Sequence, residues 1–273
     1  MKPRRERPFV ELQPNELAGL RSGAPASFLG RFDAAALRGE LARAGLADAL
    51  AQRGYPDVLL RTDVVAGEQR LRVVARGGRV SLVDLRLAEG SRLADEPLLR
   101  RRGLEILSFL AIHWLALQDP RGRFSRERPR LPGQRYPGLG LGRLLYALVL
   151  DWAQAWGKDA VLNLPEYFHN AVFYGSARPG TAAASAPLFR FLSPARQGRF
   201  EALRRDLADL PIAAASAALD KRRVRERATG RVVRWEAGEM VVPLTPGLRD
   251  YLESPEYRQA SDAARDAVSF RAS

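Results

Sequence analysis

The feature that most constrains the fold is a run of alternating glycines between an apolar segment and an amphipathic helix. The run reads Pro137-Gly138-Leu139-Gly140-Leu141-Gly142-Arg143. Glycines leave backbone N–H groups uncovered by side chains, and the first N–H groups of the helix that follows have no partner inside that helix. Because these groups and the positive end of the helix dipole converge on the turn, we expect it to bind a pyrophosphate.

The spacing of apolar residues on either side of this turn predicts both helices and strands. Helical spacing marks 33–53, 143–156, 165–174, 196–210, 212–227 and 246–259, with Asp33 as N-cap and Gly54 as stop of the first stretch. Alternating or continuous apolar residues mark strands at 58–65, 69–76, 79–87, 111–117, 159–164 and 188–192. We expect 58–65 and 69–76 to pair, and 231–244 to form a hairpin that turns at Ala237-Gly238.

This order of elements predicts an α/β (α+β) fold, built on a mixed, mainly antiparallel sheet that helices flank. We divide the chain into a loop segment over 1–30, a core over 31–193 and a C-terminal part over 194–273. The C-terminal part holds helices and the hairpin, and we expect it to pack on the core and complete it. At 273 residues the chain can bury a full hydrophobic core.

Charge and residue counts restrict the classes of function. The formal net charge of +13 suggests nucleic-acid binding, but only three residues are lysines and the basic runs hold few aromatic side chains for stacking bases. Without cysteine, and with two histidines, disulfides and thiolate chemistry are excluded and a metal site is not expected. No apolar region follows the basic N-terminus, and the run 106–117 is too short to span a bilayer. We therefore expect a cytoplasmic protein without membrane contact, either a monomer or a homodimer.

Three known kinds of glycine-rich phosphate-binding turn do not fit this sequence. A Walker A loop requires lysine and then serine or threonine after its last glycine, whereas Arg143 and Leu144 follow here. A dinucleotide-binding fingerprint requires a further glycine at the position of Leu145. A kinase loop requires a lysine on a downstream strand, and none lies between Lys2 and Lys158.

The remaining pattern, G-x-G-x-G at the start of a helix between two strands, resembles motif A of the GNAT superfamily of acyl-CoA-dependent N-acyltransferases. The family pattern Arg/Gln-x-x-Gly-x-Gly/Ala fits in two registers, one that starts at Arg135 and one, with a better helix start, at Pro137. The family's next helix carries an Asn, Ala and Tyr signature. The residues that resemble it, more tightly spaced than usual, are Asn170, Ala171 and Tyr174. The resemblance covers about residues 55–175.

The resemblance implies that the turn binds the pyrophosphate of acetyl-CoA or of another acyl-CoA, which would serve as co-substrate. The residues at this cofactor site would be Gln134, Arg135, Gly138, Leu139, Gly140, Leu141, Gly142, Arg143 and Asn170. It also implies that the strand before the turn diverges from its neighbour and holds the pantetheine arm. An amine would then attack the thioester directly, which makes the chain an N-acyltransferase that needs no metal.

Three residues are candidates for the catalytic proton transfers. In the family a tyrosine on the helix after the second strand protonates the leaving thiolate, and Tyr174 occupies the nearest matching position, with Tyr167 as the alternative. His113, in the strand before the turn, and His169, at the start of the later helix, fall beside the expected cleft, where a group that titrates near neutrality is useful. Tyr174 and His113 can instead be core residues, and His169 can simply be a residue at the start of its helix.

Two other functions stay open at this stage. The chain can be a basic nucleic-acid-binding protein in which the glycine turn is structural, or a GNAT-like protein that binds acyl-CoA without catalysis. The sequence leaves the amine acceptor open, from small amines to protein lysines and N-termini.

Overall fold

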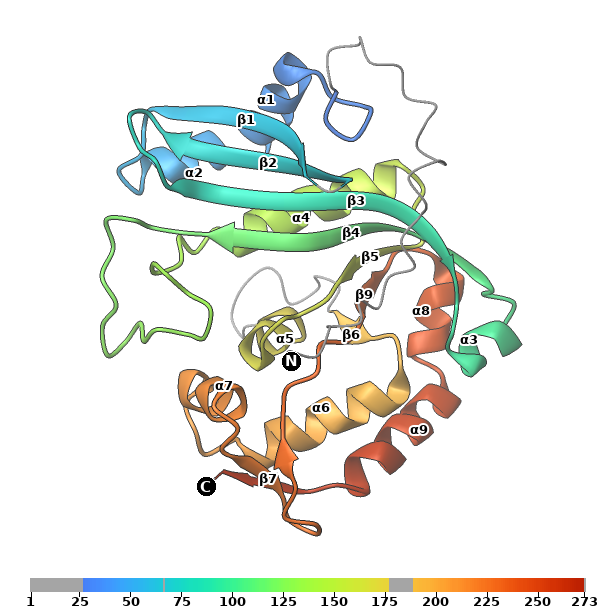
Figure 1. Cartoon of the computed structure of the whole chain (residues 1–273). Coiled ribbons are helices and arrows are strands. Elements are labelled where there is room, and N and C mark those ends of the chain that lie inside the picture. Colours follow the sequence, from blue (N-terminus) through green and yellow to red (C-terminus); the bar gives the residue numbers. More distant parts are fainter. Residues whose placement is uncertain (1–26, 66, 177–188, 273) are drawn as a thin grey trace, which may run out of the picture.

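A seven-stranded sheet forms the centre of the molecule in the computed structural model, which describes residues 27–65, 67–176 and 189–272 (Figure 1). Its strands lie in the order β1-β2-β3-β4-β5-β9-β6. Their bounds are β1 Val58–Val65, β2 Glu68–Ala75, β3 Ser81–Leu93, β4 Ile106–Leu117, β5 Ala160–Asn163, β6 Arg190–Phe191 and β9 Met240–Pro243. The pair β4–β5 is parallel and the other neighbours are antiparallel, so the predicted mixed, mainly antiparallel sheet is confirmed.

Helices cover the sheet, and several begin where the sequence predicts. They are α1 Ala34–Arg43, α2 Leu46–Ala51, α3 Pro97–Arg101, α4 Gly142–Ala155, α5 Phe168–Tyr174, α6 Pro194–Asp206, α7 Ile212–Asp220, α8 Pro246–Leu252 and α9 Pro255–Asp266. The side chain of Asp33 caps α1, because it accepts hydrogen bonds from the N–H groups of Ala35 and Ala36. The first helical stretch is divided at Gly45, whose φ of 75° starts α2.

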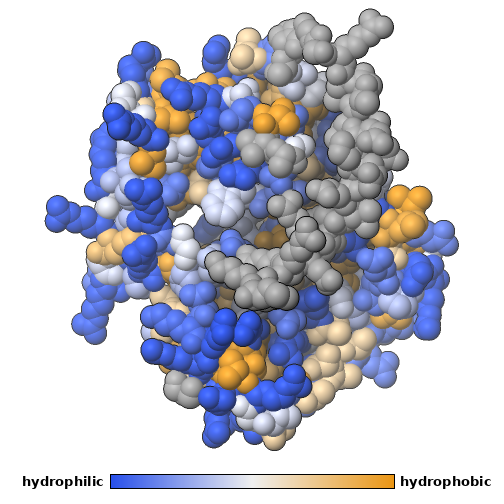
Figure 2. All heavy atoms as spheres, viewed as in Figure 1, coloured by the Kyte–Doolittle hydropathy of each residue, from blue (hydrophilic) through white to orange (hydrophobic). Residues whose placement is uncertain are grey.

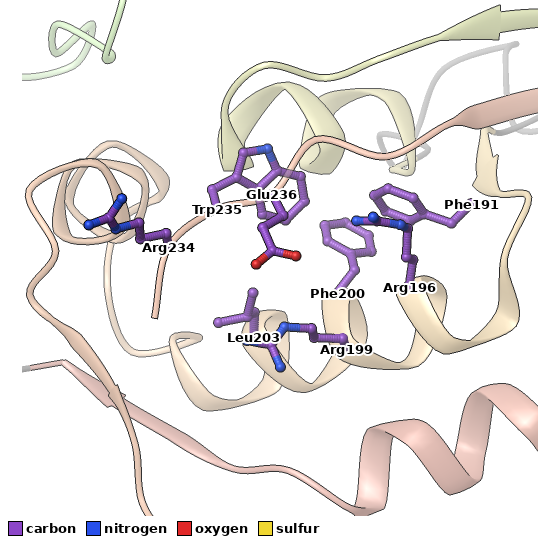
Figure 3. Close-up of a pocket in the computed structure, with 8 residues that line it drawn as sticks. All are labelled: Phe191, Arg196, Arg199, Phe200, Leu203, Arg234, Trp235 and Glu236. Carbon is purple, nitrogen blue, oxygen red and sulfur yellow. The ribbon is translucent and has the colours of Figure 1, made fainter. Parts of the chain in front are cut away.

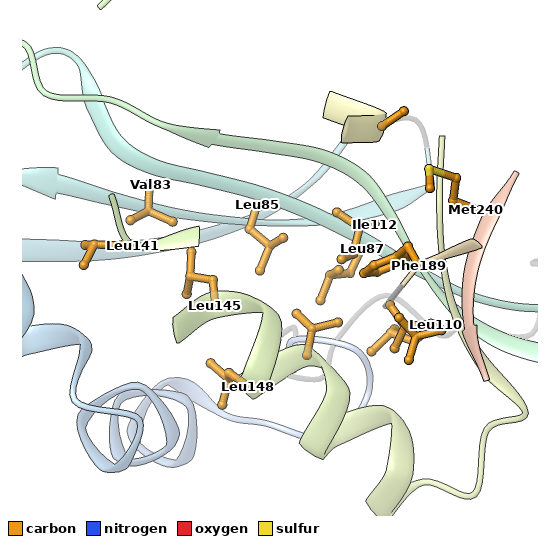
Figure 4. Packing of buried hydrophobic residues seen from close by; sticks show 14 of the residues in the cluster. Val83, Leu85, Leu87, Leu110, Ile112, Leu141, Leu145, Leu148, Phe189 and Met240 are labelled. Carbon is orange, nitrogen blue, oxygen red and sulfur yellow. The ribbon is translucent and has the colours of Figure 1, made fainter. Parts of the chain in front are cut away.

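Two hydrophobic clusters lie on opposite faces of the sheet. Successive side chains of a strand point to opposite faces, so Leu110 and Ile112 of β4 join the cluster under α4, whereas Phe109 and Ala111 join the cluster under α8. In the first cluster, α4 lays Leu145 and Leu148 against Val83, Leu85 and Leu87 of β3 (Figure 4). Leu37 of α1 and Leu50 of α2 belong to the same cluster, so these two helices pack with α4.

A smaller sheet in the C-terminal part overturns two sequence predictions. Its strands are β7 Val224–Glu226, β8 Val232–Val233 and β10 Phe270–Ala272, in the order β10-β7-β8. The predicted helix 212–227 is wrong beyond Asp220, since Arg222 adopts a φ of 60° and the chain enters β7. The predicted hairpin 231–244 is wrong as well, because β8 pairs with β7 whereas β9 is inserted between β5 and β6 of the large sheet.

Two further boundaries differ from the predictions. The predicted helix 246–259 consists of α8 and α9, and Ser254 between them accepts a hydrogen bond from the N–H of Tyr257 as the cap of α9. Strands β3 and β4 form a long pair that reaches Leu93 and Ile106, beyond the ends predicted at 87 and 111. The first 26 residues of the predicted loop segment 1–30 lie outside the described residues.

Candidate functional site

The parallel strands β4 and β5 pair over four residues and then separate. Their last pair is Ile112 with Asn163, where β5 ends, whereas β4 continues to Leu117. We call the region beyond this pair the fork. Along the fork the edge of β4 that faces away from β3 has no strand partner in the described part of the chain. The surface is hollowed there, between β4 and α5 (Figure 2).

A β-bulge marks the point at which the fork begins. On β3, Leu87 pairs with Ile112 and the preceding Arg86 pairs with Trp114, so His113 is the extra residue of β4. A bulge bends its strand and redirects the side chains around it. His113 therefore leaves the regular alternation of the strand immediately after the last pair with β5.

The glycine turn is attached to the far end of β4. The N–H of Asp119 donates to the carbonyl oxygen of Pro137 at 2.8 Å, and the N–H of Leu139 donates to that of Leu117 at 3.3 Å. Gly140 has a φ of 71°, in the left-handed region that glycine adopts without strain. The turn is thus held between the end of β4 and the start of α4.

The N–H groups of the turn and of the first residues of α4 have no acceptor among the residues that the structure describes. These are the five successive groups of Gly140, Leu141, Gly142, Arg143 and Leu144. The first bond of the helix runs from the N–H of Leu145 to the carbonyl oxygen of Leu141, and no side chain caps this end. Five such donors at the positive end of a 14-residue helix form an arrangement suited to an anion.

Two arginines from other segments hold the carbonyl groups of the turn. The Nε of Arg53, just after α2, donates to the carbonyl oxygen of Leu139 at 2.6 Å. Arg128 donates through Nη2 to the carbonyl oxygen of Gly138 at 2.7 Å. The side chain of Arg143 is exposed at the start of α4. Sequence reasoning missed Arg53, because no local pattern links that residue to the turn.

Gln134 and Arg135, the polar residues predicted to bind the cofactor from the preceding loop, interact with other residues of that loop. The side chain of Gln134 accepts a hydrogen bond from the N–H of Leu131 at 3.1 Å, and the guanidinium of Arg135 lies over the ring of Tyr136 at 5.4 Å. Asn170 lies in the first turn of α5, and its N–H donates to the carbonyl oxygen of Tyr167. No hydrogen bond or ion pair in the described structure joins these three side chains to the glycine turn.

Tyr174, the candidate acid, lies at the end of α5 in an aromatic cluster. Its ring packs edge-on against Tyr146 of α4, with centroids 5.1 Å apart, and lies 5.6 Å from Phe189. Burial raises the pKa of the Tyr174 hydroxyl, so that the group stays protonated at neutral pH. A protonated hydroxyl group therefore lies where the end of α5 meets Tyr146 of α4.

The two histidines occupy different environments. His113 is partly exposed, and its Nδ1 lies 2.7 Å from Oε1 of Glu68 on β2. His169 is 3% exposed, and its Nδ1 lies 2.8 Å from Oγ of Ser216 on α7, which is itself buried. Burial lowers the pKa of His169 to about 4. The structure thus brings His113 to the fork and places His169 between α5 and α7.

A shallow pocket at α6 offers an alternative site. It is lined by an aromatic group of Phe191, Phe200 and Trp235, with the charged side chains of Arg196 and Arg234 at its edge (Figure 3). Its volume is about 20 Å³, which accommodates about one water molecule. This pocket is therefore too small for a ligand as large as a nucleotide, whereas a second cavity, of about 370 Å³, lies between α6 and α9.

Comparison with protein-family models, with curated proteins and with solved structures finds no significant match to this chain. Within the described ranges, no three histidine or acidic side chains gather as metal ligands. Across the same ranges, no helix combines the length and apolar character needed to cross a membrane. The candidate site is therefore defined by the geometry of the turn and the fork.

Proposed function

We propose that the protein is an acyl-CoA-dependent N-acyltransferase with a GNAT-like fold, which transfers an acyl group to an amine. The observation that carries the proposal is the run of five backbone N–H groups from Gly140 to Leu144, at the N-terminus of α4 and beside the fork. The resemblance to that superfamily also implies that the strand before the turn diverges from its neighbour. Strand β4 does so, because it continues past its last pair with β5. The parallel pair β4–β5 within a mainly antiparallel sheet agrees with the mixed sheet that the resemblance implies.

The pyrophosphate of acyl-CoA is bound by the turn and by the guanidinium of Arg53. The Nη2 of Arg53 donates to no acceptor in the described part of the chain, and it lies 3.8 Å from the position that a Cβ on Gly140 would take. This nitrogen therefore lies beside the space that a side chain at position 140 would fill. A phosphate oxygen bound there by the N–H groups of the turn would also accept a hydrogen bond from Arg53. Hydrogen bonds from charged donors to phosphate are about twice as strong as neutral ones.

The pantetheine arm then follows the open edge of β4 into the fork, which places the thioester near the bulge at His113. The amine nitrogen attacks the carbonyl carbon, the C–S bond breaks, and the thiolate takes up a proton. Tyr174 donates that proton, since burial keeps its hydroxyl protonated. The pair of His113 and Glu68 accepts the proton that the amine releases. His169 has no part in this step, because it is buried against Ser216.

Isothermal titration calorimetry with acetyl-CoA and with free CoA tests the proposal, using two matched glycine variants. Gly140→Asp places a carboxylate in the turn, whereas Gly157→Asp makes the same change just beyond the other end of α4. Both glycines are exposed, with φ of 71° and 63°, so the two variants carry similar backbone strain. We expect Gly140→Asp to weaken binding by at least about tenfold, and Gly157→Asp to leave it unchanged.

Two results would contradict the proposal. One is that the wild-type protein binds neither CoA nor acetyl-CoA; the other is that both variants weaken binding equally. Binding to DNA or RNA that falls steeply with salt, without affinity for CoA, would instead favour a nucleic-acid-binding protein. Tight CoA binding without turnover of any amine would leave a protein that binds acyl-CoA without catalysis.

A further inference from the structure

Unpaired polar groups gather at the base of the fork. The described residues contain eight buried side-chain nitrogen or oxygen atoms without a hydrogen-bond partner. Four of the eight belong to Asn163 at the end of β5, Tyr146 of α4 and Ser176 just after α5, namely Oδ1 and Nδ2 of Asn163, Oη of Tyr146 and Oγ of Ser176. Buried polar groups in proteins are nearly always paired, so such a concentration indicates that a ligand or water completes the set.

Asn163 is the most deeply buried of the three. It is 2% exposed, and its backbone pairs with Ile112 of β4 on one side and with Met240 of β9 on the other. Paired residues of neighbouring strands point to the same face, so the carboxamide lies between two apolar side chains. An unpaired carboxamide in such a place destabilises the fold, and the other residues of β5 are alanine, valine and leucine. A leucine would suit Asn163's position better unless the carboxamide binds something.

Tyr146 approaches the same place from α4. Its ring packs against Tyr174 and against Phe189, with centroids 5.1 and 5.7 Å apart. Ile112 and Met240, the two strand neighbours of Asn163, lie together with Phe189 at one end of the core (Figure 4). Asn163 and Tyr146 therefore both adjoin the cluster that holds Ile112, Met240 and Phe189, and none of these five residues carries a charge.

We propose that the Asn163 carboxamide and the Tyr146 hydroxyl bind a neutral polar substituent, a hydroxyl or keto oxygen, on the acyl group that is transferred. This inference rests on the proposed function, because it is the fork that would bring the acyl group to these two side chains. A carboxamide and a hydroxyl each offer a donor and an acceptor; a hydroxyl substituent pairs with both kinds of group, whereas a keto oxygen accepts hydrogen bonds from the donors. An unsubstituted chain of the same length leaves both groups unpaired, and uncharged surroundings disfavour a carboxylate.

Two acyl-CoAs that differ by one hydroxyl test the inference. We expect the wild-type protein to bind 3-hydroxybutyryl-CoA at least about tenfold more tightly than butyryl-CoA in calorimetry. Asn163→Leu, of similar volume, should bring the two affinities within about threefold of each other without weakening that for butyryl-CoA. Tyr146→Phe deletes only the hydroxyl and should also reduce the preference for 3-hydroxybutyryl-CoA over butyryl-CoA. This variant provides the test if Asn163→Leu does not fold.

The possible failures are distinguishable. If the wild-type protein binds both acyl-CoAs equally, or if both variants keep the preference, the inference is wrong and the proposed function stands. The same holds if Asn163→Leu raises the melting temperature and leaves the preference unchanged, since water then satisfies the carboxamide. If neither acyl-CoA nor free CoA binds to the wild-type protein, the proposed function is wrong and the inference fails with it.

Discussion

The Nε of Arg53 donates a hydrogen bond of 2.6 Å to the carbonyl oxygen of Leu139, and this bond ties the end of α2 to the glycine turn. A second bond, of 2.8 Å from Nη1 of Arg53 to the carbonyl oxygen of Ala49, holds the guanidinium against the preceding helix α2. The cation is therefore positioned beside the turn in the protein alone. A side chain that is ordered before binding loses little conformational entropy when an anion arrives.

We predict that Arg53→Ala weakens the binding of acetyl-CoA by about tenfold, because it removes a preorganised cation beside the pyrophosphate and also loosens the turn. Calorimetry at low ionic strength measures the change. Arg38→Ala is the matched control, since Arg38 is an exposed arginine on α1 that makes no contact with the turn. Equal affinities for the Arg53 and Arg38 variants would show that only the overall positive charge of the protein matters.

We predict that Tyr174→Phe lowers kcat at least about 100-fold while the dissociation constant of the acyl-CoA changes less than about threefold. The ring keeps its packing against Tyr146 and Phe189, so only the proton donor is removed. Because burial raises the pKa of Tyr174, its deprotonation should not reduce the wild-type rate up to about pH 9. Steady-state kinetics with release of free thiol measure these values. A variant with unchanged kcat would assign the proton transfer to another group.

Much of the fold follows from local pattern. Asp33 could be predicted as a cap because its side chain bonds the next N–H groups, and β1 and β2 could be predicted as a pair because they adjoin in sequence. The hairpin at 231–244 was predicted on the same logic and is wrong. Both of its strands prefer partners that are distant in sequence, β7 for one and β5 with β6 for the other, and no local residue signals such partners.

The candidate site could be predicted only in part, for the same reason. The glycine turn can be predicted because its residues are adjacent in sequence. Arg53 cannot, because it lies 86 positions before Leu139, whose carbonyl oxygen it binds. Asn163 is a polar residue that ends the apolar strand Ala160-Val161-Leu162, but sequence reasoning gave it no role in the site. Whether such a residue faces solvent or the core depends on β4 and β9, which flank it.

We predict opposite effects on stability from two glycine-to-alanine changes in helices. A Cβ on Gly198 of α6 would lie 2.1 Å from the carbonyl oxygen of Ser261 on α9, so Gly198→Ala must push the two helices apart and should cost about 3 kcal/mol. Gly39 of α1 has no atom within 4 Å of the same position, so Gly39→Ala should stabilise the protein by about 1 kcal/mol. Urea denaturation measures both. A stable Gly198→Ala protein would mean that α6 and α9 pack less closely than described.

We predict that His169 makes the protein less stable in acid. Burial lowers its pKa to about 4, whereas the unfolded chain has a value near 6.5, so the unfolded state binds more protons between these pH values and stability falls as the pH drops through that window. The difference between the two pKa values corresponds to about 3 kcal/mol. His169→Asn keeps a polar group near Ser216 but does not titrate there, so the loss between about pH 7 and about pH 4 should shrink by that amount in urea denaturation. An equal loss in the variant would show that other groups cause the acid sensitivity.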